Sequence, residues 1–210
     1  MTAPQETARQ AALDAFLGLI AEKGFADVTL RAVAQSAGLG FADLYQYFPN
    51  KVALVAAFLA RIDAAVLAAT SAASDPEESA RDRLFDVMMR RYDALRPHRA
   101  ALRALRRAGQ RDPLFALAIA PAVQRSMAAM LESAALPTDG WAGALRQNGL
   151  VAVHGAVSRV FDQDETGDLS KTMAALDGHL KRVERWSQLF EKYTPSAKKA
   201  EPSESPGPTG

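Results

Sequence analysis

The sequence predicts an all-α fold. Ala and Leu dominate it, β-branched residues are few, and no alternating apolar–polar run reaches the length of a strand. Hydrophobic residues make up 49% and charged residues 23% of the 210 positions, a composition typical of a globular chain that buries a substantial core. Apolar periodicity and capping residues predict about nine helices, at 5–23, 30–36, 41–48, 51–72, 77–95, 98–109, 113–135, 139–162 and 169–192.

The segment 29–51 predicts two short helices around a tight turn. Thr29 is a good N-cap for the first, and Gly38 supplies the positive φ that the corner needs. Pro49 ends the second helix, and Asn50 caps the helix that follows. Two short helices joined by about four residues form a helix-turn-helix, whose second helix reads the major groove of DNA.

Proline residues delimit most of the later helices. Asp75-Pro76 is expected to open the helix at 77–95, with Glu77 and Glu78 in a first turn where the helix dipole favours acids. Residues 194–210 are rich in Pro, Ser and Gly, which predicts a disordered tail. The remaining boundaries fall at Pro97, Asp112-Pro113 and Pro137-Thr138-Asp139.

The first 55 residues carry a recognisable pattern, made by Ala11, Ala12, Phe16, Leu17, Gly24-Phe25, Thr29, Val33-Ala34, Ala37-Gly38-Leu39, Leu44-Tyr45, Tyr47-Phe48 and Lys51. This pattern resembles the N-terminal domain of TetR-type transcriptional regulators. The resemblance implies a helix-turn-helix DNA-binding domain at 1–52 and a helical ligand-binding and dimerisation domain at 53–193, followed by the tail. It further implies a cytoplasmic, homodimeric, ligand-responsive repressor of a palindromic operator.

Ten residues are expected to form the DNA-binding surface, carried over from the family position by position. Thr29, Tyr45, Tyr47 and Lys51 would contact the phosphate backbone, which fixes register without reading sequence; Tyr45 alternatively belongs to the core. Gln46 would hydrogen-bond an adenine edge, while Phe41 and Ala42 would meet a thymine methyl group. The complete set is Thr29, Arg31, Gly40, Phe41, Ala42, Asp43, Tyr45, Gln46, Tyr47 and Lys51.

Three features of this domain disagree with tight DNA binding. Gly40 stands where the family usually has Ser or Thr, so the helix lacks a capping hydroxyl. Asp43 puts a carboxylate near phosphate where the family usually has a small hydroxyl residue, although an acid in the first turn also suits capping. Residues 1–60 carry a net charge of −1. Because non-specific affinity comes from cationic contacts to phosphate, modest binding is expected.

Small residues gather at 142–158, which carries several Gly and Ala residues inside a predicted helix. Gly costs about 1 kcal/mol relative to Ala within a helix, so their number indicates close helix approach. The resemblance assigns the helices at 139–162 and 169–192 to a four-helix dimer interface; the alternative is packing within one chain. The small residues are Ala142, Gly143, Ala144, Gly149, Ala152, Gly155, Ala156 and Ser158.

The middle helices are expected, by resemblance, to enclose a cavity for a small apolar or amphipathic effector. Met adapts to irregular ligands, although a Met or aromatic stripe at helical spacing is more often ordinary core. The candidate wall residues are Met88, Met89, Tyr92, Leu95, Leu102, Leu105, Phe115, Met127, Met130, Leu131, Trp141 and His154.

Residues 81–111 hold ten Arg and a net charge of +7. Arg99, Arg103, Arg106 and Arg107 gather on one side of the helix at 98–109, which suits an anionic membrane or an acidic partner, or else a solvated face with a few ion pairs.

Several classes of site are not expected. The chain has no Cys, which excludes disulfides, a thiolate nucleophile and Cys-ligated metals. Residues 162–168 imitate the start of a calcium loop, but Met173 occupies the twelfth position, where a bidentate Glu is required. The three His are scattered, and no nucleophile elbow occurs, so we expect no metal, no cofactor and no enzymatic activity. No run approaches 18 apolar residues and no signal peptide is evident, so we expect no transmembrane segment.

A second function also fits parts of the sequence. The segment 169–184 and the basic stretch 81–111 resemble the TetR-derived ubiquinone-biosynthesis accessory family, which keeps the fold but binds isoprenoid lipid and an enzyme partner instead of DNA. The acidic N-terminal domain suits this alternative. The set of Tyr45, Tyr47 and Lys51 argues for DNA binding.

Overall fold

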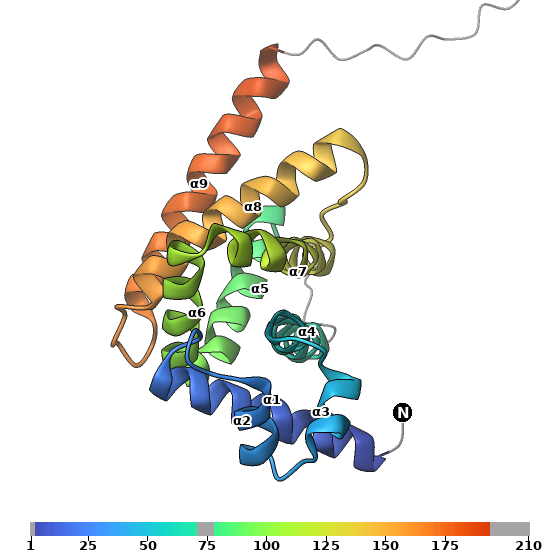
Figure 1. The fold of residues 1–210 in the computed structure, drawn as a ribbon. Coiled ribbons are helices and arrows are strands. Elements are labelled where there is room, and N and C mark those ends of the chain that lie inside the picture. Colours follow the sequence, from blue (N-terminus) through green and yellow to red (C-terminus); the bar gives the residue numbers. More distant parts are fainter. Residues whose placement is uncertain (1–2, 71–77, 194–210) are drawn as a thin grey trace, which may run out of the picture.

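The computed structural model describes residues 3–70 and 78–193, and side chains as far as residue 185. Within this part of the chain every regular element is helical, which confirms the predicted all-α class (Figure 1). The elements are α1 (Ala3–Lys23), α2 (Leu30–Ser36), α3 (Phe41–Tyr47), α4 (Lys51–Thr70), α5 (Ala80–Leu95), the 3₁₀ helix η1 (Arg96–His98), α6 (Arg99–Arg111), α7 (Pro113–Ser133), α8 (Gly140–Phe161) and α9 (Ser170–Tyr193).

Local capping explains the early helix boundaries. Thr29 Oγ1 accepts a hydrogen bond from Ala32 N at 3.2 Å at the start of α2, and Asn50 Oδ1 accepts one from Ala53 N at 2.8 Å at the start of α4. Gly38 adopts φ +68° between α2 and α3. These three features are as predicted, because each depends on residues only a few positions apart.

Four predicted boundaries differ from the structure by two or more residues. Helix α1 begins at Ala3 rather than at residue 5, and α6 ends at Arg111 rather than at residue 109. Helix α5 begins at Ala80 rather than at residue 77, because Ser79 is the N-cap and its Oγ accepts a hydrogen bond from Asp82 N at 3.1 Å. Asp75-Pro76 and Glu77, which were expected to open this helix, lie outside the described residues. Helix α7 ends at Ser133 rather than at residue 135, because Ala135 turns to φ 56°. The predicted disordered tail at 194–210 also lies outside the described residues.

Figure 1 shows α1, α2 and α3 together at one end of the molecule, with α8 and α9 packed against each other on the opposite side. Helices α4 and α7 lie between them and pack against each other, burying Leu54, Phe58, Met127 and Met130. Helices α4 and α7 therefore lie between the short N-terminal helices and the α8–α9 pair.

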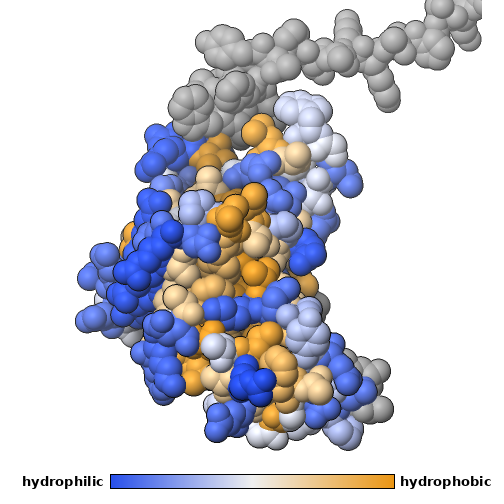
Figure 2. All heavy atoms as spheres, in the orientation of Figure 1, coloured by the Kyte–Doolittle hydropathy of each residue, from blue (hydrophilic) through white to orange (hydrophobic). Residues whose placement is uncertain are grey.

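The same two helices are long and apolar enough to cross a membrane, judged by length and composition. Core helices of water-soluble folds meet the same criterion, so this observation is weak evidence. In this chain α4 and α7 direct their apolar faces at each other and at the surrounding helices. Figure 2 shows hydrophobic residues along the middle of one face, bordered by hydrophilic ones.

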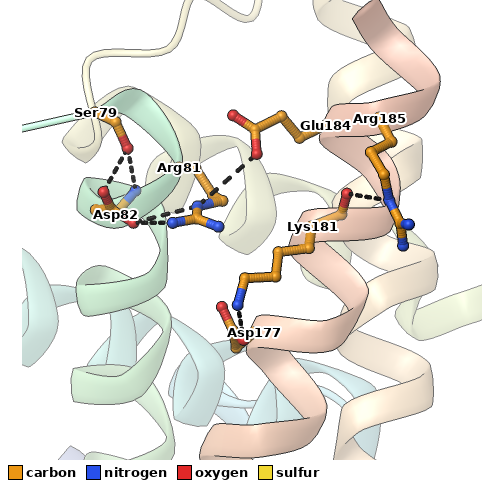
Figure 3. A network of polar contacts seen from close by, with 7 residues as sticks. All are labelled: Ser79, Arg81, Asp82, Asp177, Lys181, Glu184 and Arg185. Carbon is orange, nitrogen blue, oxygen red and sulfur yellow. Dashed lines mark hydrogen bonds and ion pairs between the residues drawn. The ribbon is translucent and has the colours of Figure 1, made fainter. Parts of the chain in front are cut away.

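Polar contacts join α5 to the outer helix α9 (Figure 3). Arg81 forms an ion pair with its neighbour Asp82 at 2.8 Å and a longer one with Glu184 of α9 at 3.9 Å. Lys181 pairs with Asp177 one turn earlier on α9 at 2.7 Å. These contacts are exposed and individually weak. They supplement the apolar packing of Leu176 and Leu180, which anchors α9.

Candidate nucleic-acid interface and ligand cavity

Helix α3 is attached to the domain by one face. Leu44 is fully buried and Phe48, its C-cap, is almost so. Because helical residues four apart share a face, the two anchors leave the other side of α3 free. Ala42, Asp43 and Gln46 lie on that exposed side.

The aromatic residues of the candidate surface occupy different positions. Tyr45 is 53% exposed, so it belongs to the surface and not to the core, whereas Tyr47 is half-buried. Arg31 of α2 places its guanidinium 5.0 Å from the centre of the Phe41 ring, and the Phe41 and Tyr45 rings are 6.0 Å apart. The structure therefore brings Arg31, Phe41 and Tyr45 into one exposed cluster spanning α2 and α3.

Lys51 occupies a different environment from the free side chain expected of a phosphate contact. Its Nζ donates to the carbonyl oxygen of Phe25 at 2.7 Å and to that of Ala26 at 3.4 Å, and lies 4.3 Å from the centre of the Phe25 ring. Burial lowers the pKa of Lys51, and the Asp27 carboxylate partly offsets this. The ammonium therefore ties the start of α4 to the end of α1, with one of its three protons left for another acceptor.

Gly40 and Asp43 are coupled at the start of α3. A Cβ atom built on Gly40 would lie 2.7 Å from Asp43 Oδ2. The absence of a side chain at position 40 thus leaves the space that the Asp43 carboxylate occupies above the first turn. The two departures from the family pattern therefore form a single local arrangement.

Helices α4, α5, α6, α7 and α8 line a cavity of about 390 Å³ that opens to the surface. Four of the twelve predicted wall residues, Leu95, Leu102, Leu105 and His154, line it. The other candidate residues lie outside this cavity, because apolar residues at helical spacing can face either the core or a cavity. The cavity is lined by Val55, Leu59, Arg91, Leu95, Leu102, Leu105, Arg106, Gly109, Gln110, Ile119, Val123, His154, Gly155, Ser158, Arg159 and Phe161.

The remaining predicted wall residues need correction. Trp141 is 78% exposed near the start of α8, because the preceding turn directs it to the surface. Phe115 lines a separate cleft of about 790 Å³ between the N-terminal helices and the α6–α7 corner. Met89 is half-buried against the core. The fully buried core residues among the candidates are Met88, Tyr92, Met127 and Met130.

A polar centre that was not predicted from the sequence lies beside this cavity. Arg91, only 1% exposed, donates from Nη1 to Asp63 Oδ1, which also accepts from Ser126 Oγ at 2.6 Å. Arg91 Nε is buried without a hydrogen-bond partner. The available signal was an Arg on the apolar face of α5, between Met88 and Leu95.

His154 contributes a neutral polar group. Burial lowers its pKa to about 3, and the nearby charges of Arg91 and Arg106 act in the same direction. Its Nδ1 lies 3.1 Å from the hydroxyl oxygen of Tyr92, whose pKa is raised by burial. A neutral imidazole can accept a hydrogen bond at Nδ1 from the Tyr92 hydroxyl. The arginines are then the cations that line the cavity.

The basic residues of α6 make contacts within the chain. Arg103 donates to the backbone carbonyl of Asp162, and Arg106 forms an ion pair with the Asp162 carboxylate. The Arg99 guanidinium lies 4.6 Å from the centre of the Phe161 ring. Cations near the last carbonyls of a helix are favourable, so this cluster fastens α6 to the end of α8. The contacts agree with the interpretation of this stretch as a basic face with ion pairs.

A further aromatic contact joins the N-terminal helices to the larger domain. The rings of Phe25 and Phe115 have centroids 4.2 Å apart, and Lys51 covers the Phe25 ring as well. Helix α1 also packs against α6. Helices α6 and α7 therefore both contact the base of the helix-turn-helix.

The three N-terminal helices form a unit in which the short helix α3 is exposed, and the remaining helices line a cavity. This is the arrangement of a helix-turn-helix protein with a further helical region. Residues 12–58 match the family model described as bacterial regulatory proteins, tetR family. The N-terminal part of the chain, from α1 into α4, is therefore similar to TetR-family regulators.

Similar proteins agree with this assignment. The HTH-type transcriptional repressor KstR of Rhodococcus jostii (strain RHA1) is 44% identical over 57 residues, which span 27% of this chain and 27% of that protein. A TetR transcriptional regulator from Nitrosomonas europaea ATCC 19718 superposes with a TM-score of 0.67 at 20% identity, covering 84% of this chain and 98% of that one. Another from Rhodococcus sp. RHA1 has a TM-score of 0.63 at 22% identity, covering 86% and 97%. At these identities the superpositions show the fold.

Proposed function

We propose that this protein is a cytoplasmic, dimeric, ligand-responsive repressor that binds a palindromic DNA operator. The exposed face of α3, on a domain that matches the TetR family model, carries the proposal. Gln46, Phe41 and Ala42 would face base edges in the major groove. Thr29, Arg31, Tyr45, Tyr47 and the remaining proton of Lys51 would contact phosphates, with Gly40 and Asp43 beside them at the start of α3.

The exposed face of α8 supports a dimer through α8 and α9. Ala152 and Gly155 are exposed there, together with Trp141 and Leu145, which are 78% and 63% exposed. A Cβ built on Gly155 meets no atom within 4 Å, so close packing inside the chain does not account for this glycine. A second copy would cover the apolar face and set the spacing between two α3 helices, as two half-sites one helical turn apart require.

The dimer can be tested at one exposed position. Ala152→Arg is expected to yield monomers in sedimentation, because it places a charge in the centre of the proposed interface. Ala60→Arg, on the exposed side of α4, is the matched control and should leave the dimer intact. A dimeric Ala152→Arg variant would show that the interface lies elsewhere.

The cavity between α4 and α8 supports regulation by a ligand. It borders α6 and α7, and these helices contact α1 and Phe25 at the base of the DNA-binding domain. A ligand that favours one arrangement of these helices would select a dimer whose α3 helices no longer match successive major grooves.

DNA binding can be tested by selecting genomic fragments at low salt, followed by anisotropy titrations at two salt concentrations. Wild type should bind modestly, since residues 1–60 carry a net charge of −1. Asp43→Thr should strengthen binding by removing a negative charge near phosphate, and Gln46→Ala should change sequence choice. No binding by wild type or Asp43→Thr at either salt would refute the proposal.

The alternative is a TetR-fold accessory protein that binds lipid instead of DNA. Two observations favour it: Lys51 is engaged by backbone carbonyls, and the Asp43 carboxylate occupies the start of α3. In this case isoprenoid lipid would co-purify with the protein, and the DNA titrations would be flat for wild type and Asp43→Thr alike.

A further inference from the structure

The cavity lined by α4 to α8 opens to the surface and has a largely apolar wall. Its volume of about 390 Å³ falls within the range of roughly 300–1,000 Å³ typical of small-molecule sites. Such a surface binds the apolar body of a ligand and gives it little orientation. The aliphatic lining residues are Val55, Leu59, Leu95, Leu102, Leu105, Ile119 and Val123.

The polar part of the same wall is cationic. Arg91, Arg106 and Arg159 line the cavity, and none of its lining residues is Asp or Glu. A cationic ligand would therefore meet like charges there. His154 adds a neutral ring, and Ser158 a hydroxyl group.

Arg91 points to a ligand oxygen. Its guanidinium is almost completely buried, and its Nη1 is used by Asp63, yet Nε has no hydrogen-bond partner. A buried N–H without an acceptor is unfavourable, and an arginine nitrogen can only donate. An acceptor atom in the cavity would complete this group.

The charge balance identifies that acceptor as anionic. Arg91 is neutralised by Asp63 and Arg106 by Asp162. Arg159 lies exposed at the edge of the cavity and has no ion pair with any described residue. One positive charge is thus left uncompensated beside an apolar space.

We propose that the effector of this cavity is an amphipathic carboxylate, whose aliphatic body lies among the Leu, Val and Ile side chains. A carboxylate oxygen accepts a hydrogen bond from Arg91 Nε, and Arg159 balances the charge. This inference rests on the proposed ligand-responsive function and names the chemical class of the ligand.

Calorimetric titration of the full chain with three probes of equal chain length tests the head group. Decanoate, below its critical micelle concentration, should bind saturably with one site per chain. 1-Decanol should bind at least about tenfold more weakly, because it lacks the charge that strengthens such hydrogen bonds, and decylammonium should show no saturable binding. Equal affinities for decanoate and 1-decanol, or saturable binding of decylammonium, would overturn the proposal.

Variants locate the site. Arg159→Gln should weaken decanoate binding several-fold, whereas Arg125→Gln, an exposed arginine of α7 outside the cavity, should leave it unchanged. Ile119→Trp should abolish binding by filling the space. Arg91→Lys keeps a charge beside Asp63 but removes Nε, and it should weaken decanoate binding more than 1-decanol binding. Unchanged decanoate affinity in both Ile119→Trp and Arg159→Gln would place the ligand elsewhere.

DNA titrations without any probe separate this inference from the proposed function. If DNA binds and decanoate does not, only the ligand class is wrong. If decanoate binds as described and no DNA binds at either salt, the regulator proposal fails while the cavity assignment holds.

Discussion

Asp164 is expected to organise the turn between α8 and α9, and its substitution should loosen the proposed dimer interface. The side chain is fully buried, and each carboxylate oxygen accepts two hydrogen bonds. Thr166 donates to Oδ1 from its backbone N at 3.2 Å and from its hydroxyl, while the N and Oγ1 of Thr172 both lie 2.7 Å from Oδ2. The carboxylate thus caps the first turn of α9, which begins at Ser170.

Asp164→Asn replaces one acceptor oxygen by a donating NH₂ group. The threonine hydroxyl on that side can rotate away, but the backbone N–H cannot. Loss of a hydrogen bond to a charged group costs roughly 1.5–3 kcal/mol, and leaving a buried donor unsatisfied adds to this. We expect the free energy of unfolding to fall by about 3 kcal/mol at pH 7, measured by urea denaturation.

The same contact predicts a dependence on pH. Burial alone would raise the pKa of Asp164, but the hydrogen bonds from Thr166 and Thr172 hold it well below its usual range. A folded-state pKa below the unfolded value of about 3.9 stabilises the fold above that pH, and the contribution is lost as the pH falls below it. The difference between wild type and Asp164→Asn should therefore shrink as the pH is lowered from 5 towards 3.

Glu165→Gln is the matched control, because Glu165 is the exposed neighbour of Asp164 in the same turn. It should change the free energy of unfolding by less than about 0.5 kcal/mol. If Asp164→Asn and Glu165→Gln behave alike, or if the effect of Asp164→Asn is the same at pH 7 and pH 3, the capping role is refuted.

Three further substitutions test other features. Ala135→Gly should raise the free energy of unfolding by about 0.5–1 kcal/mol in urea denaturation. Ala135 is exposed at φ 56°, and glycine adopts this region without the penalty of about 1–2 kcal/mol that other residues incur. A lower stability of the variant would contradict this. Gly143→Ala should destabilise by about 3 kcal/mol, because its Cβ would lie 2.1 Å from the carbonyl carbon and oxygen of Thr138; a neutral effect would show that this turn adjusts freely. Lys51→Ala should lower the melting temperature, because the hydrogen bond to the Phe25 carbonyl is lost. It should also reduce the slope of DNA affinity against salt concentration by about one. An unchanged slope would mean that the ammonium makes no phosphate contact.

The sequence was most informative where structure depends on neighbours along the chain. The caps at Thr29 and Asn50 form as predicted, and Asp112 caps α7 at the boundary predicted there, because each cap is made within two or three residues. The positive φ of Gly38 follows from the same local chemistry. The resemblance of the first 55 residues to TetR-type regulators agrees with the family model, which matches residues 12–58.

Tertiary structure decided which groups meet. Apolar periodicity marks the inner face of a helix but not the element that covers it. From the sequence, the core residue Met88 and the exposed Trp141 were therefore indistinguishable from residues that line the cavity, such as Leu105. Lys51 was expected on DNA, yet its ammonium reaches a carbonyl 26 residues earlier in the chain. Arg91 and Asp63 pair across 28 residues. Such contacts depend on how helices cross, and no local pattern encodes the crossing. The sequence by itself therefore determined most helices, their caps and the resemblance of the N-terminal domain, whereas only the folded chain decided which charges are satisfied and which side chains line the cavity.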